Sequence, residues 1–127
     1  MEPSAVEKEI KSKAKEWTDE YGEEFLLELI DVYLVDTPNR IAQLHQALDG
    51  GDTETLVREA HTLKSSSANV GALGLSALAK EMESCGRRGV LERMASHVVE
   101  FEELFAQVKT ALETIRKSAG QWDGQER

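Results

Sequence analysis

The sequence is poor in the residues that hold together many small secreted or β-rich domains. It has one cysteine, Cys85, so no disulfide can form within the chain, and we expect a reducing compartment. Aromatic residues make up only 6% of the 127 residues, which favours aliphatic helix packing over a β-sandwich. Only two prolines occur, so long helices are permitted. These absences favour one helical domain, and the chain is long enough to bury a core.

Long apolar runs and a surplus of basic residues are also missing. No stretch approaches the roughly 20 apolar residues that a membrane-spanning helix needs. The chain has 24 acidic and 15 basic residues, which gives a net charge of −9. This charge disfavours binding to nucleic acid or to an anionic lipid surface. We therefore expect a soluble domain, whether free or part of a membrane protein.

Apolar residues recur every three or four positions along five stretches, which is the spacing of amphipathic helices. Residues with a turn preference separate these stretches: Gly22, the run 49–52, Gly71 and the run 87–89. Pro38 lies inside the second stretch, where it costs about 3 kcal/mol by removing a helical hydrogen bond. The apolar pattern keeps its phase through Pro38, so one long kinked helix is favoured over two separate helices.

The predicted fold class is all-α. We expect an antiparallel four-helix bundle over residues 22–118, with an additional helix within residues 1–21 that covers one end of it. In the last stretch the apolar positions are expected to run from Val90 to Ile115. Gly120 can end that helix, which leaves residues 119–127 as a flexible tail.

One histidine lies on the polar side of the third predicted helix. Asp52 suits the start of this helix and Gly71 suits the left-handed residue after its end. The inward positions carry apolar or small side chains: Leu56, Ala60, Leu63, Ser67 and Val70. His61 lies about 140° from the middle of that stripe. Its helical neighbours are a cation on each side and small residues: Arg58, Lys64, Ser65 and Ala68. An outward imidazole in such surroundings indicates a site that another molecule must reach.

The segment from His61 to Gly71, HTLKSSSANVG, resembles the signature of histidine-containing phosphotransfer (HPt) domains. That signature has leucine two residues after the histidine, lysine at the third, small residues next, and glycine at the tenth. Ser65 stands where the family commonly has glycine. The helical pattern fits the family from about Phe25 to Ile115. The resemblance implies a cytoplasmic phosphorelay intermediate, either free-standing or at the cytoplasmic end of a membrane-anchored hybrid sensor kinase, with His61 as the phosphoacceptor.

The chemistry of this site follows from the ring itself. An imidazole is partly neutral near pH 7, and its free nitrogen lone pair can attack phosphorus to give a phosphoramidate. Lys64, one turn along the helix, can stabilise charge on the phosphoryl oxygens, and the resemblance implies the same role. The three histidines lack the spacing of metal ligands. We therefore expect no metal site or cofactor of the chain's own, and Mg²⁺ from the partner.

The resemblance implies receiver domains of response regulators as partners of a monomeric HPt domain. A receiver carries its phosphorylatable aspartate in an acidic pocket, which the basic side chains of Arg58, Lys64, Lys80 and Arg87 should attract. In some family members a polar side chain 22 residues after the histidine and an arginine 26 after it order the site. Glu83 and Arg87 occupy these positions. Because a glutamate would repel a phosphoryl group, we expect Glu83 to pair with Lys80 or Arg87 instead.

Two other functions remain open. The first is the dimerising phosphoacceptor hairpin of a sensor histidine kinase, which usually has an acid directly after its histidine and a proline soon after. Here Thr62 follows His61 and no proline lies downstream, and without glycine-rich nucleotide motifs no ATP-dependent kinase activity is expected. The second is a non-catalytic helical module that binds a receiver domain or a kinase without phosphotransfer.

Overall fold

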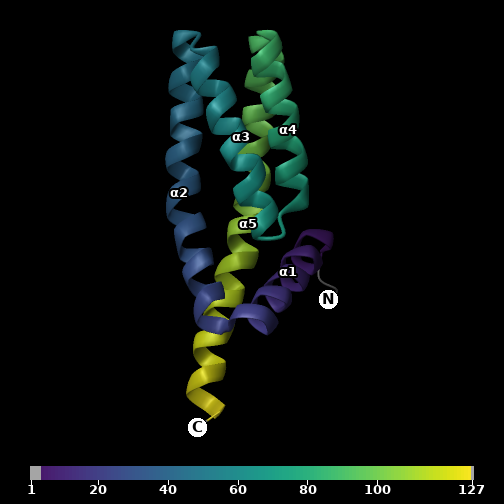
Figure 1. Ribbon diagram of the computed structural model, residues 1–127, viewed down its shortest axis with the longest axis vertical. Helices are drawn as coiled ribbons and strands as arrows, with labels where there is room; N and C mark the ends of the chain where they lie inside the picture. The colour runs from purple at the N-terminus through teal and green to yellow at the C-terminus, as the bar shows by residue number, and fades with distance from the viewer. Residues whose placement is uncertain (1–3, 127) are drawn as a thin grey trace.

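Five α-helices make up the computed structural model, which describes residues 4–126 and the side chains of residues 4–119. In chain order the helices are α1 (Ala5–Tyr21), α2 (Glu23–Gly50), α3 (Thr53–Asn69), α4 (Leu73–Arg88) and α5 (Leu91–Glu126). Figure 1 shows α2, α3, α4 and α5 side by side along the long axis, with α1 crossing near one end. The predicted all-α bundle with a covering helix is confirmed. None of the described helices has the length and apolar content that a membrane span requires.

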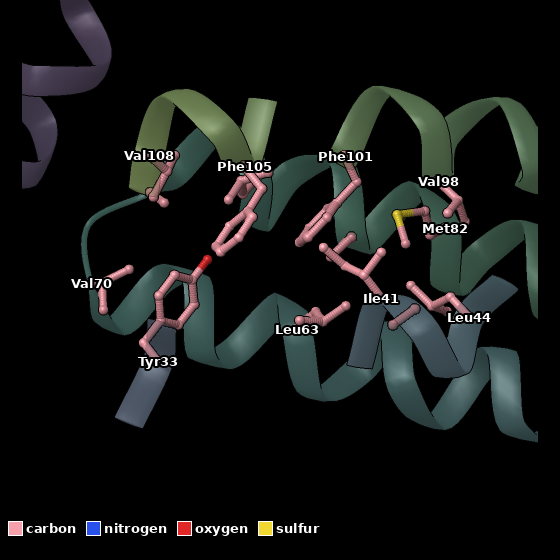
Figure 2. Close-up of a cluster of buried hydrophobic side chains, with 14 of the residues drawn as sticks. Tyr33, Ile41, Leu44, Leu63, Val70, Met82, Val98, Phe101, Phe105 and Val108 are labelled. Atoms are coloured by element: carbon pink, nitrogen blue, oxygen red, sulfur yellow. The ribbon is translucent and has the colours of Figure 1, made fainter. Parts of the chain in front are cut away.

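The inward stripe predicted for α3 forms the centre of the core. All five of its positions are buried: Leu56, Ala60, Leu63, Ser67 and Val70. Figure 2 shows Leu63 in one cluster with Ile41 of α2, Met82 of α4 and Phe101 of α5. Full burial of such a side chain contributes about 1.5–3 kcal/mol. The four bundle helices therefore share a single core.

A polar residue in this stripe is accommodated by a partner from α2. The hydroxyl of Tyr33 lies 2.9 Å from Oγ of Ser67, and both side chains are buried. Because burial penalises the phenolate, the pKa of Tyr33 is raised to about 12, so the phenol keeps its proton. The pair joins α2 to α3 in the antiparallel register that the bundle requires.

The ends of α3 are those that the sequence predicts. The side chain of Asp52 accepts a hydrogen bond of 3.1 Å from the backbone N–H of Thr55, as an N-cap does. After the helix, Gly71 has φ +83°, and the chain turns there into α4. Helix α1 lies against this turn: Nε1 of Trp17 donates a 2.6 Å hydrogen bond to the carbonyl oxygen of Asn69.

Gly71→Ala should destabilise the domain by about 2–4 kcal/mol. The left-handed backbone costs a side-chain-bearing residue roughly 1–2 kcal/mol, and a Cβ atom there would also meet α1. It would stand 2.6 Å from Cβ of Lys13 and 2.8 Å from the backbone oxygen of Glu9. Gly51→Ala is the matched control, because Gly51 has φ +66° and open space around it. Urea unfolding measures the loss in free energy of unfolding for both variants, and the difference between the two losses is the cost of the clash with α1. Equal losses in the two variants would show that the predicted clash has no effect on stability.

Two expectations about the long helices meet different outcomes. Helix α2 runs as one helix through Pro38, as favoured from the phase of its apolar pattern. Helix α5 is helical to Glu126, so the expected end at Gly120 is wrong. A glycine inside a helix costs about 1 kcal/mol relative to alanine, which weakens a helix without ending it. The flexible tail predicted for 119–127 falls almost wholly on residues outside the described side chains and stays a prediction.

The inward stripe of α5 was predicted to start at Val90, but Val90 lies outside the helix. Val90 is 39% exposed and precedes the helix, which starts at Leu91. The reason is the preceding turn: Gly89 has φ +69° and ends α4, so Val90 belongs to the connection. The later positions from Met94 to Leu112 are buried as expected.

Candidate functional site

His61 projects from α3 with its ring open to solvent. Its side chain is 60% exposed, although the residues directly before it and two after it, Ala60 and Leu63, are fully buried. The helical twist alone produces this contrast, because Ala60 and Leu63 share the inward side and His61 does not. The ring is therefore accessible to another molecule.

Glu83 of α4 is the residue that organises the site. Its side chain is only 10% exposed, and its carboxylate accepts hydrogen bonds from three groups. Nδ1 of His61 lies 3.1 Å away, Nζ of Lys64 lies 2.9 Å away, and Nη2 of Arg87 lies 2.8 Å away. The bonds from Arg87 and then Lys64 lower the pKa of Glu83 to about 2. At neutral pH the group is an anion held between two cations.

The charge on Glu83 fixes the tautomer of the neutral His61 ring. An ionised carboxylate has no hydrogen to donate, so Nδ1 must carry the hydrogen that they share. The lone pair then resides on Nε2. Nε2 has no hydrogen-bond partner among the described residues. The arrangement leaves the exposed ring with one nitrogen available as a nucleophile.

Close packing of α3 on α4 brings these side chains together. A Cβ atom on Gly86 would lie 2.9 Å from Cγ2 of Val57, so the two helices approach closely there. One face of α4 then meets α3 along its length, and Oγ of Ser76 donates a 2.8 Å hydrogen bond to the carbonyl of Lys64. Glu83 lies between these two contacts, at the level of His61.

The other expected site residues are placed as follows. Glu83 pairs with Arg87 as expected but not with Lys80, which is exposed and has no ion pair in the described part of the chain. Arg58 lies 3.8 Å from a carboxylate oxygen of Glu59, and together with Arg87 it lines a shallow hollow between α3 and α4. On α3, Ser65 is exposed and Ala68 is half-buried.

Sequence reasoning missed two features of this region. It did not foresee that Glu83 binds His61 and Lys64, because that contact depends on the register between two helices. It also overlooked Glu59, a carboxylate that is 8% exposed and accepts a 2.8 Å hydrogen bond from Arg40 of α2. An acid two residues before His61, on the inward side of the helix, was the available signal.

Glu83→Gln should remove one component of the pH dependence of stability. The native pKa of Glu83, about 2, lies below its ordinary value of 4.5, so its ion pairs stabilise the fold fully above pH 4.5. That contribution is lost as the pH falls from 4.5 towards 2. The variant should be less stable at pH 6 by roughly 1–3 kcal/mol, and the difference should shrink at pH 3. Urea unfolding at both values measures it, and a difference independent of pH would contradict the assignment.

No group of three or more histidine, cysteine, aspartate or glutamate side chains within the described residues is placed to hold a metal ion. The expectation that Mg²⁺ comes from a partner is not tested by this observation and stays a prediction. The chemistry available to this chain's own residues is that of one nucleophilic nitrogen beside two cations.

Comparison with known proteins agrees with this site. The family model of the Hpt domain matches residues 28–118. Among solved structures, the chain is similar to the crystal structure of histidine-containing phosphotransfer protein B (HptB) from Pseudomonas aeruginosa PAO1. The two share 31% sequence identity and a TM-score of 0.80, over 84% of this chain and 91% of that one. No curated protein matches. The chain belongs to the Hpt domain family, whose helical bundles serve histidine phosphotransfer in phosphorelays.

Proposed function

We propose that this chain is a phosphorelay intermediate. Nε2 of His61 accepts a phosphoryl group from the aspartate of a receiver domain and passes it to, or back to, another receiver domain. One observation carries the proposal: the ring is 60% exposed while Nδ1 is bonded to the carboxylate of Glu83. A histidine that served only in packing would not combine that exposure with a fixed tautomer.

The transfer step is a displacement at phosphorus. The Nε2 lone pair forms the N–P bond as the bond between phosphorus and the aspartyl oxygen breaks, and the carboxylate leaves with the electron pair. The hydrogen on Nδ1 stays with His61, where Glu83 accepts it. The reverse step returns the phosphoryl group to an aspartate. Mg²⁺ is proposed to come with the receiver, whose acidic pocket offers the carboxylate oxygens that this ion prefers as ligands.

Lys64 is the residue proposed to stabilise the transferred group. Its Nζ donates a 2.9 Å hydrogen bond to the carboxylate of Glu83. The Lys64 side chain is 33% exposed, so its ammonium group remains partly accessible to solvent beside the His61 ring. A cation in this position can attract the phosphoryl oxygens as charge develops on them. Glu83 itself is proposed to orient the ring, since direct contact with a phosphoryl group would bring two anions together.

The charges around His61 suit an acidic partner. Arg58 and Arg87 are 61% and 63% exposed, and Lys80 is exposed on the same side of α4. Two cations, Lys64 and Arg87, face the single carboxylate of Glu83, which leaves the site locally positive despite a net charge of −9. Such a local excess steers an acidic pocket towards the ring.

The decisive experiment is transfer from a receiver domain labelled with ³²P on its aspartate. Label that appears on this chain and is stable to base but labile to acid supports the proposal, because phosphoramidates have that stability. A screen against the receivers of the source genome identifies the partner. The second candidate, a binding module without transfer, predicts that the label stays on the receiver while the two proteins still associate.

Lys64→Ala should slow phosphotransfer by about tenfold or more, or shorten the lifetime of the phosphohistidine to a similar extent. Its removal deletes a cation beside the ring but no core contact, so the far-UV circular dichroism should be unchanged. Lys109→Ala, an exposed lysine of α5, is the matched control and should leave transfer unaltered. Rapid-quench measurement of labelled protein gives both rates. Identical kinetics in the two variants would remove Lys64 from the mechanism.

A further inference from the structure

His61 bonds to Glu83 through the ring nitrogen that the proposed transfer does not use. Nδ1 donates to the carboxylate at 3.1 Å, whereas the bond to phosphorus forms at Nε2. The two nitrogens lie on different sides of the five-membered ring, so a phosphoryl group on Nε2 leaves the contact with Glu83 in place. If Nδ1 keeps its hydrogen while Nε2 carries phosphorus, the ring bears a positive charge. The contact with Glu83 therefore bears on the charge of the phosphorylated ring.

A charged and a neutral phosphohistidine differ as phosphoryl donors. In either form the N–P bond breaks with its electron pair passing to nitrogen, while an oxygen of aspartate or water forms the new bond to phosphorus. With a hydrogen on Nδ1, the ring leaves as neutral imidazole. Without that hydrogen it leaves as an imidazolate anion, which is a poor leaving group and must then gain a proton from solvent. The charged form is therefore the faster donor and the shorter-lived one.

Before phosphorylation, the charges around the ring favour its neutral form. Glu83 is an anion at neutral pH, because the hydrogen bonds from Arg87 and then Lys64 lower its pKa to about 2. Arg87 and Lys64 contribute two positive charges against this one negative charge. A third positive charge on the ring is disfavoured by this excess. The neutral ring keeps the Nε2 lone pair that attacks phosphorus.

Phosphorylation reverses this balance of charge. A phosphoryl group carries up to about two negative charges near neutral pH, which more than offsets the positive excess of the site. A positive ring is then attracted by the phosphoryl group and by the carboxylate of Glu83, which accepts the hydrogen of Nδ1. An imidazole in water loses that hydrogen near neutral pH. The charges of the phosphorylated site favour its retention at higher pH.

The other charged groups near α3 do not alter this balance directly. On α3 itself, Arg58 is 61% exposed and its nearest acid is Glu59, 3.8 Å away. On α2, Arg40 bonds to Asp36 and to Glu59. Lys80 of α4 is exposed. Within the described part of the chain, no charged side chain of α1, α2 or α5 is bonded to the site residues on α3 and α4.

We propose that phosphorylation converts the ring of His61 from a neutral nucleophile into a cation that Glu83 stabilises up to about pH 8. The conversion rests on the proposed function, in which Nε2 of His61 is the phosphoacceptor. The phosphorylated chain consequently passes its phosphoryl group on quickly and stores it only briefly. The charge of Glu83, and not only its position, sets how long the phosphoryl group stays on the ring.

The protonation of the phosphorylated ring can be measured on the wild-type chain. Phosphoramidate, a small-molecule donor, phosphorylates a chain that carries ¹⁵N-labelled histidine. The ¹⁵N chemical shift of Nδ1 in His61 then distinguishes a nitrogen with hydrogen from one without. At pH 8 we expect Nδ1 to carry its hydrogen after phosphorylation and the ring to be neutral before it. A phosphorylated ring without that hydrogen at pH 8 would overturn the proposal.

Glu83→Gln separates the charge of this side chain from its position. Glutamine is of the same size and can still bond to the ring, but it cannot stabilise a cation as a carboxylate does. At pH 8 the phosphohistidine of this variant should live about tenfold longer than in the wild type and should donate to a receiver about tenfold more slowly. At pH 5.5 both rings are protonated, so the two lifetimes should converge.

Glu59→Gln is the matched control for this change. Glu59 is 8% exposed, similar to Glu83, but its carboxylate bonds to Arg40 and not to His61. Its phosphohistidine lifetime should equal that of the wild type at both pH values, and circular dichroism confirms that both variants fold. A lifetime in Glu83→Gln that is unchanged or shorter at pH 8 would contradict the proposal. The ring measurement uses no receiver, so failure of a receiver to phosphorylate the chain would count against the proposed function alone.

Discussion

His61→Gln is expected to abolish the transfer of label to this chain while leaving its fold intact. Glutamine retains a polar side chain of similar reach but has no nitrogen lone pair that can attack phosphorus. The wild-type ring is 60% exposed and contributes little packing, so the free energy of unfolding should change by less than about 1 kcal/mol. Glu83 keeps its bonds to Lys64 and Arg87 in the variant, which preserves the contact between α3 and α4.

The other two histidines provide matched controls for this result. His45 is bonded to Glu102 and is 47% exposed, and His97 is bonded to Glu100 and is 21% exposed. Neither has a lysine one turn further along its helix, so His45→Gln and His97→Gln should accept label at the wild-type rate. Labelling with a phosphorylated receiver compares the three variants. If the His61→Gln variant still accepted label from the receiver, the phosphoacceptor would be another residue and the proposed function of His61 would be wrong.

Leu63→Asp is expected to unfold the domain at 25 °C. Leu63 is fully buried among side chains of the other three bundle helices. The change deletes a leucine, which alone costs about 2–5 kcal/mol. It also buries a carboxylate without a partner, which adds several kcal/mol. The sum is comparable with the total stability of a typical domain, about 5–15 kcal/mol.

Far-UV circular dichroism and a thermal scan test this expectation. Ser65→Asp is the control, because it introduces the same carboxylate two residues away on the exposed side of α3. The control should melt cooperatively near the wild-type temperature, and Leu63→Asp should show no transition. A cooperative transition at the wild-type temperature in both would mean that the inward side of α3 is assigned wrongly.

The sequence predicted those features that depend on neighbours within one helix. The burial of Leu63 and the exposure of His61 both follow from the helical period, and the ends of α3 follow from the preferences of Asp52 and Gly71. These features depend on residues that are close together along the chain, so they can be predicted from the amino-acid sequence alone.

Features that depend on how helices meet were not predictable in the same way. Glu83 reaches His61 only because α4 packs on α3 at a particular register, and the close approach at Gly86 sets that register. The pairing of Glu83 with Arg87 was foreseen because those two residues lie one turn apart on the same helix. Its bonds across to α3 could not be read from spacing along the chain.

The contrast between two turns decides where a reporter can be built into this protein. At Gly71 the connection packs against α1 and leaves no space for an added methyl group. An insertion there would therefore displace α1 from the bundle. The connection at Gly50 and Gly51 is exposed and has open space around both residues. A fluorescent protein or a tag for surface immobilisation belongs at that second connection, where the ring of His61 and the first helix both remain undisturbed.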